Sequence, residues 1–83
     1  MKIDEDKVDD VTLALMYLVA WKEDKESPRS AWKSFDWDTL NRLHEKGLIS
    51  DPKKKAKSVV LSDEAYEKAE KLFQEMFRKE DEK

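Results

Sequence analysis

Apolar residues recur at helical spacing between about residues 7 and 23. One stripe consists of aliphatic side chains three or four positions apart: Val8, Val11, Leu15, Leu18 and Val19. Positions with this spacing share one face of an α-helix. Leu13, Met16 and Ala20 widen the apolar surface. A helix that is apolar over so much of its circumference is expected to be covered on more than one side. We therefore predict a central first helix, capped by an aspartate near its start.

A polar connection and a short second helix are predicted next. Ser27 followed by Pro28 has the order of an N-cap and a proline in the first helical position. This order favours a helix over residues 29–34. Such a helix would bury Ala31 and Trp32 and expose the lysine that follows them.

The third predicted helix has clear signals at both ends. Asp36 is a good N-cap residue, and Phe35 before it is placed to pack on Leu40. Gly47 is the only glycine in the chain and follows the last apolar position of this helix. A glycine in the left-handed C′ position would fold Leu48 back onto the helix. We therefore expect the helix to end at Gly47.

The remaining pattern predicts a β-hairpin and a last helix. Residues 48–51 read as a first short strand, a loop begins at Pro52, and residues 57–61 alternate as a second strand. Ser62 is the expected N-cap of the last helix. Its apolar positions occupy one arc of the helical wheel: Ala65, Tyr66, Ala69, Leu72, Phe73, Met76 and Phe77.

Together these elements predict one domain over residues 1–83. The expected class is mainly α with a small β-hairpin (α+β), in the order α-α-α-β-β-α. We expect the charged residues 1–5 and 79–83 to fray. A chain of this size buries only about 60–65% of its unfolded surface, so its core should be small.

Composition excludes several classes of protein and site. Charged residues make up 45% of the chain, yet the net charge is only −3, and the apolar residues are periodic, so we expect a folded domain. Without cysteine the chain has no disulfide, thiolate metal site or cysteine nucleophile. His44 is the only histidine and has no catalytic partner one helical turn away. We therefore expect no enzyme, metal site, cofactor or small-molecule substrate.

The N-terminal segment is acidic rather than basic and then apolar, so we expect no signal peptide. The longest nearly apolar run, Val11 to Trp21, is too short to cross a bilayer as a helix. These observations favour a cytoplasmic protein with no membrane partner.

Part of the chain resembles known bacterial regulators. The stretch Leu40–Ile49, then a basic loop, then Val59–Glu64, looks like the end of the recognition helix, the wing and the next helix in MarR-like and PadR-like proteins. A longer string from Phe35 to Leu61 resembles a family of small uncharacterised bacterial proteins, which brings no known activity. The resemblance implies a winged helix-turn-helix fold and a homodimer built by the terminal helices.

Charge is segregated along the chain. Residues 1–26 carry 4 basic and 8 acidic residues, residues 27–61 carry 8 and 4, and residues 62–83 carry 5 and 8. The positive charge of the middle segment is concentrated in the expected wing: Lys53, Lys54, Lys55 and Lys57. Lysines in such a loop can contact nucleic-acid phosphates. The alternative is a solvated turn, in which lysine protects a hairpin edge from aggregation.

The third helix adds Arg42 and Lys46 as candidate nucleic-acid contacts. It departs from a typical recognition helix because it also carries three acidic residues: Asp36, Asp38 and Glu45. A helix that enters the major groove usually presents more basic and amide side chains. A continuous basic face would favour nucleic-acid binding, and interruption by the acidic residues would favour a protein partner.

Two regions are candidate protein contacts. Trp37 lies in a first helical turn between aspartates, where an exposed aromatic side chain can anchor a partner. The end of the last helix carries four large apolar residues: Leu72, Phe73, Met76 and Phe77. They either pack on the first helix of the same chain or form a homodimer, which a core this small can need.

Two functions are therefore expected from the sequence. The first is a non-enzymatic binding module of winged-helix type that contacts DNA through the third helix and the lysine-rich wing. The second is a protein-interaction or dimerisation module that has lost DNA binding.

Overall fold

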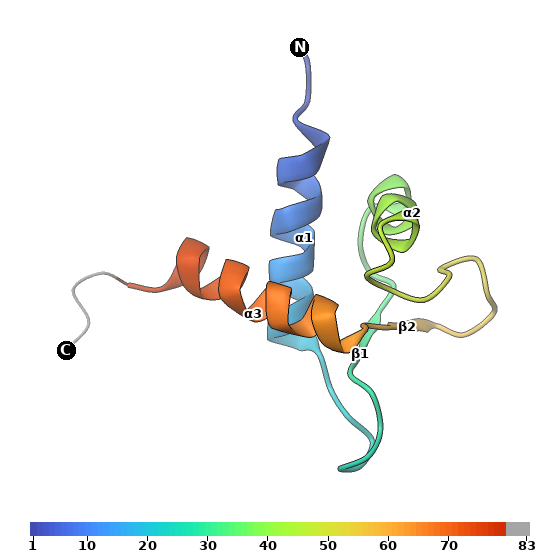
Figure 1. Ribbon diagram of the computed structural model, residues 1–83. Coiled ribbons are helices and arrows are strands. Elements are labelled where there is room, and N and C mark those ends of the chain that lie inside the picture. Colours follow the sequence, from blue (N-terminus) through green and yellow to red (C-terminus); the bar gives the residue numbers. More distant parts are fainter. Residues whose placement is uncertain (80–83) are drawn as a thin grey trace.

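The computed structural model describes residues 1–79 of the chain. It contains α1 (Glu5–Val19), β1 (Ser30–Trp32), α2 (Trp37–Glu45), β2 (Ser58–Val60) and α3 (Asp63–Phe77). Figure 1 shows α3 lying across α1, with α2 and the two strands on one side of this pair. The protein is thus a small mixed α/β structure of three helices and a two-stranded antiparallel sheet. The predicted fraying beyond residue 79 falls outside the described residues.

Side-chain caps start all three helices. Asp4 accepts a hydrogen bond from the backbone N–H of Lys7 at 3.2 Å, and Ser62 accepts one from Ala65 at 3.0 Å. Asp36 accepts hydrogen bonds from both the N–H and the hydroxyl of Thr39, at 3.0 and 2.9 Å. Each cap satisfies a donor that the first helical turn leaves without a partner. The predicted caps at Asp36 and Ser62 are confirmed.

Gly47 ends α2 as predicted. Its φ is 79°, in the left-handed region. The N–H of Gly47 donates to the carbonyl of His44 at 2.9 Å, and the N–H of Leu48 donates to the carbonyl of Leu43 at 3.0 Å. These two bonds form a Schellman motif, which satisfies the last carbonyls of the helix.

The predicted short helix over residues 29–34 is wrong, because β1 occupies this segment. Ser30, Ala31 and Trp32 pair antiparallel with Val60, Val59 and Ser58 of β2. A helix of six residues is marginal, whereas strand pairing supplies partners to the backbone. Alternation along the strand buries Ala31 and turns Trp32 outward, so the expected burial of Trp32 is also wrong. The element order is therefore α-β-α-β-α.

The same sheet changes two other expectations. The first predicted hairpin strand, residues 48–51, forms only an isolated bridge between Ile49 and Leu61. Instead, β2 pairs along its whole length with β1, which precedes α2 in the sequence. In addition, α1 ends at Val19 rather than near residue 23, because Trp21 exchanges two backbone hydrogen bonds with Ser30, at 3.0 and 2.9 Å.

The core lies where α1, α2, α3 and the sheet meet. Its buried residues come from every element: Leu13, Met16, Ala31, Leu40, Leu43, Ile49, Val59, Leu61, Ala65 and Ala69. Ala65 and Ala69 are one helical turn apart on α3, and both are fully buried. Their small side chains let α3 approach α1 closely.

Only part of the apolar surface of α1 reaches this core. The helix buries Leu13, Ala14 and Met16, while Val11, Leu18 and Val19 on the predicted stripe are exposed. The expectation that α1 is covered on more than one side holds for the sides that face α2 and α3. It is wrong for Val11, Leu18 and Val19, whereas Val8 and Leu15 of the same stripe are half-buried.

Candidate nucleic-acid interface

The structure separates the predicted basic contacts into two groups. Arg42 lies on α2 and Lys46 is the residue that caps its C-terminal end, and both reach the carboxylate of Asp9 on α1. Arg42 approaches Asp9 Oδ1 at 2.9 Å through Nε and at 2.8 Å through Nη2, and Lys46 Nζ lies 2.9 Å from Oδ2. Asp9 is only 1% exposed. We call these three residues the Asp9 cluster.

The Asp9 cluster is electrostatically self-contained. Burial alone would raise the pKa of Asp9, but the hydrogen bonds from Arg42 and Lys46 outweigh it and lower that pKa below its usual value. The same bonds raise the pKa of Lys46 and of Arg42. Glu5 and Asp6 at the start of α1 add weaker pairs to the two cations, at 3.6 and 3.2 Å. The cluster therefore fixes α2 on α1 and leaves little positive charge for a phosphate.

The outward surface of α2 is acidic and aromatic rather than basic. Asp38 and Glu45 are exposed there, as is Trp37. His44 places Nδ1 3.0 Å from the carbonyl oxygen of Ile49, which is a structural contact. The basic face is thus interrupted at α2.

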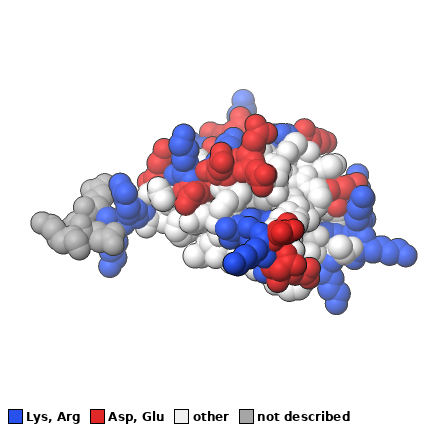
Figure 2. All heavy atoms as spheres, turned by 60° about the horizontal axis from the view of Figure 1, so that its bottom comes forward, with Lys and Arg blue, Asp and Glu red and all other residues white. Residues whose placement is uncertain are grey.

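The second basic group is the loop between α2 and β2. Its four lysines, which we call the loop lysines, are all exposed: Lys53, Lys54, Lys55 and Lys57. Among the described residues, none of the four takes part in an ion pair. Figure 2 shows basic side chains projecting from the side of the molecule where this loop lies in Figure 1. The loop therefore concentrates four available positive charges in one short segment.

Hydrogen bonds hold this loop in a defined shape. Asp51 accepts a bond from the N–H of Lys53 at 2.9 Å, which lowers the pKa of its carboxyl group. Pro52 is buried beside it. Lys33, which follows β1, donates through Nζ to the carbonyl of Lys54 at 2.6 Å. The start of the loop is therefore fixed by a bond within the loop, and its middle is tied to the residue that follows β1.

Trp32 adds an aromatic surface next to the loop lysines. Trp32 is 54% exposed, and its ring lies against that of Trp21, with ring centroids 4.7 Å apart. A shallow depression brings the ring together with basic and small residues from β1 and the loop: Trp32, Lys33, Ser34, Lys55, Ala56 and Lys57. Sequence reasoning missed Trp32, because it placed this residue in a helix. The alternation of small Ala31 and large Trp32, followed by lysine, was the available signal.

The predicted protein-contact residues of α3 divide between two environments. Leu72 and Phe73 are half-buried, and the Phe73 ring lies 5.3 Å from that of Tyr17 on α1. Tyr17 also donates a hydrogen bond to Glu70 at 3.4 Å. Its burial is the larger cause, and the charge of Glu70 the smaller one, of a raised pKa of Tyr17. Met76 and Phe77 are exposed. The beginning of the arc therefore packs on α1 of the same chain, whereas Met76 and Phe77 at its end are exposed.

Metal binding and membrane insertion were two further possibilities for the described part of the chain. Over residues 1–79, no group of three or more histidine, aspartate and glutamate residues is arranged to hold a metal ion. No helix in this range is both long enough and apolar enough to cross a membrane.

Comparisons with known proteins agree over nearly the whole chain. Residues 4–79 match the model of a family described as Domain of unknown function (DUF6429). An uncharacterised protein named y4hR, from Sinorhizobium fredii (strain NBRC 101917 / NGR234), is 53% identical over 77 residues, which cover 93% of this chain and 97% of the relative. No solved structure matches.

Proposed function

The chain belongs to this bacterial family of unknown function, and on that premise we propose that it is a non-enzymatic module that binds nucleic acid through the loop lysines and Trp32. The observation that carries the proposal is an exposed aromatic ring in one depression with Lys55 and Lys57. Binding without sequence readout is the expected mode.

The loop lysines supply the phosphate contacts. Four exposed ammonium groups lie on one short loop, and none of them takes part in an ion pair among the described residues. Each phosphate that they neutralise releases counterions, so affinity falls as salt rises. Protection of a hairpin edge from aggregation explains the lysines less well. β2 pairs with β1 on one side, and Leu61, which follows β2, bridges to Ile49 on the other.

Trp32 supplies the contact to a base. Exposed aromatic rings beside a basic groove stack on unpaired bases, whatever their sequence. Trp21 lies against Trp32 and limits its freedom, so less rotamer entropy is lost on stacking. The proposal therefore favours single-stranded nucleic acid over a duplex, in which the bases are already stacked.

In this proposal α2 does not read bases. Its two basic residues are held by Asp9, and its exposed residues include Asp38 and Glu45. The resemblance to winged-helix regulators supports only the role of the basic loop as a wing. DNA contact by Arg42 and Lys46 would require the Asp9 cluster to open.

The test is fluorescence anisotropy with a labelled single-stranded oligonucleotide and its duplex, at low and moderate salt. Changing all four loop lysines to serine should weaken binding at least tenfold. For four phosphate contacts on a single strand, the logarithmic salt slope of the wild type should be about −3. Trp32→Ala should cost about 1–3 kcal/mol of binding to the single strand and less to the duplex.

A matched control removes the same charge elsewhere. Lys2, Lys25, Lys68 and Lys71 are exposed lysines outside the loop, and changing all four to serine should leave most of the affinity. Equal losses of affinity in the two fourfold variants would show that binding depends on the net charge of the protein and not on the position of the loop lysines. Absence of binding by the wild type even at low salt would refute the nucleic-acid proposal and leave the protein-interaction alternative, for which exposed Trp37 is the first residue to change.

A further inference from the structure

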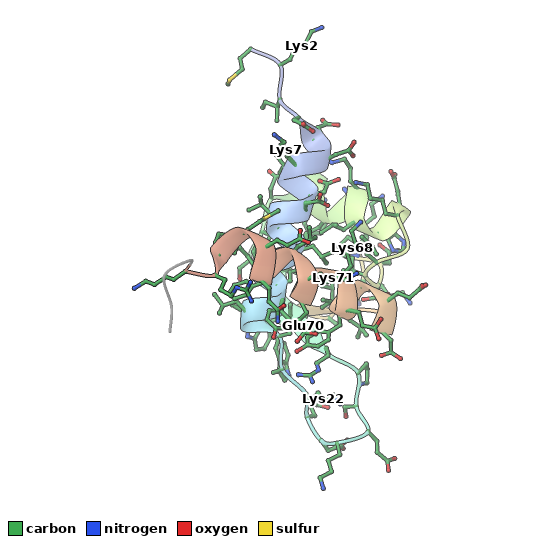
Figure 3. All side chains as sticks on the ribbon, turned by 60° about the vertical axis from the view of Figure 1, so that its left-hand side comes forward. Lys2, Lys7, Lys22, Lys68, Glu70 and Lys71 are labelled. Carbon is green, nitrogen blue, oxygen red and sulfur yellow. The ribbon has the colours of Figure 1, made fainter. Side chains whose placement is uncertain are left out.

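One lysine beside the candidate interface binds the loop instead of facing solvent. Lys33 follows β1 and is half-buried. Its side chain donates to the carbonyl of Lys54 at 2.6 Å, across 21 positions of the sequence, and its backbone N–H donates to the carbonyl of Lys57 at 3.1 Å. Lysines elsewhere, such as Lys68 and Lys71 on the outward face of α3, are exposed and form no such bond among the described residues (Figure 3). Lys33 therefore holds the loop through both its side chain and its backbone.

The two bonds of Lys33 lie on either side of a segment that has little other support. Before the segment, the N–H of Lys54 donates to the carbonyl of Asp51 at 3.4 Å. Lys55 and Ala56, between the two carbonyls that Lys33 binds, take part in no hydrogen bond among the described residues. Fixing a backbone costs conformational entropy, which these two residues cannot offset with bonds of their own. The bond from Lys33 to Lys54 therefore sets their position.

The segment that Lys33 holds supplies the basic side of the depression at Trp32. Lys55 and Lys57 line this depression together with the ring of Trp32. Lys57 precedes the residue of β2 that pairs with Trp32, so this end of the segment is fixed by the sheet. The other end is fixed to the sheet side only by the bond at Lys54. A strand whose phosphates lie on the loop places a base on Trp32 only if the lysines and the ring keep a constant spacing.

We infer that Lys33 is a positioning residue that makes the interface selective for single-stranded nucleic acid. The inference rests on the proposed function, because it concerns the same loop and the same ring of Trp32. By binding the carbonyl of Lys54, the ammonium group of Lys33 orders the loop before the nucleic acid arrives, which lowers the entropy lost on binding. Without this bond the loop lysines still attract any polyanion, since that attraction needs no fixed geometry. What is lost is the spacing that lets one strand contact the lysines and Trp32 together.

The alternative is that Lys33 contacts phosphate itself, since it also lines the depression. Its Nζ already donates to the carbonyl of Lys54 at 2.6 Å, and a phosphate would have to compete with this bond or share the ammonium group with it. The two roles differ in their dependence on salt. Each phosphate contact adds about 0.7 to the steepness of the logarithmic salt slope on a single strand, whereas a residue that only orders the loop adds nothing. The salt slope therefore distinguishes positioning from direct contact.

Fluorescence anisotropy over a salt series, with a labelled single strand and its duplex, measures this difference. Lys33→Met removes the donor and the charge. It should weaken binding to the single strand about three- to tenfold, affect the duplex less and leave the salt slope unchanged. The matched control is Lys53→Met, which removes the same charge from an exposed side chain of the loop. It should make the slope shallower by about 0.7 and weaken both ligands alike. Lys33→Arg keeps a donor and should restore the selectivity. A slope shallower by about 0.7 in Lys33→Met, or equal losses for strand and duplex, would overturn the inference.

NMR relaxation of the backbone amides tests the ordering of the loop without nucleic acid. In the wild type, the order parameters of Lys55 and Ala56 should lie near the value of about 0.85 for rigid backbone, and in Lys33→Met they should fall below about 0.6. Lys53→Met and Lys33→Arg should keep the wild-type values, and the helices should be unaffected in every variant, which shows that the fold is intact. Unchanged order parameters in Lys33→Met would refute the positioning role even if the wild type binds nucleic acid. A wild type that binds neither ligand, with order parameters that fall in Lys33→Met, would refute the proposed function and the selectivity but not the ordering of the loop by Lys33.

Discussion

Two groups of basic residues lie on either side of the turn that ends α2, and they have opposite relations to their surroundings. Arg42 and Lys46 share one buried carboxylate, with contacts of 2.8 to 2.9 Å to Asp9. The loop lysines have no ion-pair partner among the described residues and project into solvent. In the sequence both groups read as candidate phosphate contacts, and only the position of α1 separates them.

The difference shows how one buried acid changes the role of its neighbours. A carboxylate taken out of water is stable only if cations and donors surround it. Asp9 therefore needs Arg42 and Lys46, and these residues hold α2 in place. The loop lysines make no comparable contact with the core, so their charge remains available to a ligand. Three changes test this division.

The largest effect is expected from the buried member of the Asp9 cluster. Asp9→Ala leaves Arg42 and Lys46 without their acceptor and should lower the free energy of unfolding by about 2–3 kcal/mol. The value should stay below that for a fully buried pair, because both cations can regain water. Urea unfolding measures the change, with Asp10→Ala as a control that should cost no more than about 0.5 kcal/mol. Equal losses of stability in the two variants would mean that Asp9 acts only as an acidic residue near the N-terminal end of α1, and not as the acceptor of Arg42 and Lys46.

A smaller effect is expected from acid. The pKa of Asp9 in the folded protein is lowered, so its stabilising contribution is present above the unfolded pKa of about 3.9 and is lost as the pH falls through the folded value. Stability should therefore decline progressively below about pH 5. Asp24, Asp36 and Asp51 also have lowered pKa values, so Asp9→Asn should make the decline shallower without removing it. An unchanged slope in Asp9→Asn would contradict the assigned role of the cluster.

The smallest effect compares one lysine from each group. Lys46→Ala removes a partly exposed partner of Asp9 and should lower the free energy of unfolding by about 0.5–1 kcal/mol. Lys54→Ala should leave stability unchanged within error and should weaken nucleic-acid binding instead. Thermal unfolding and anisotropy on both variants show whether stability and binding separate in this way. A Lys54→Ala variant as destabilised as Lys46→Ala would make the loop a structural element.

Local signals in the sequence were sufficient for several features of the fold. Asp36 caps α2 through a residue three positions away, and Gly47 ends it through carbonyls within the same turn. Interactions of this range depend on neighbouring residues alone, so residue type and spacing predict them. The lysine-rich loop was predicted for the same reason, since its charge is a property of one short segment.

The tertiary structure decided the rest, because it depends on partners far along the chain. The segment around Ala31 becomes a strand only when β2 is beside it, and Asp9 becomes a structural acid only when α2 presents Arg42. The periodicity of α1 predicted a helix correctly, but the helix is apolar on two sides. Which side faces the core was fixed by the elements that pack against it, so Val11, Leu18 and Val19 were left exposed.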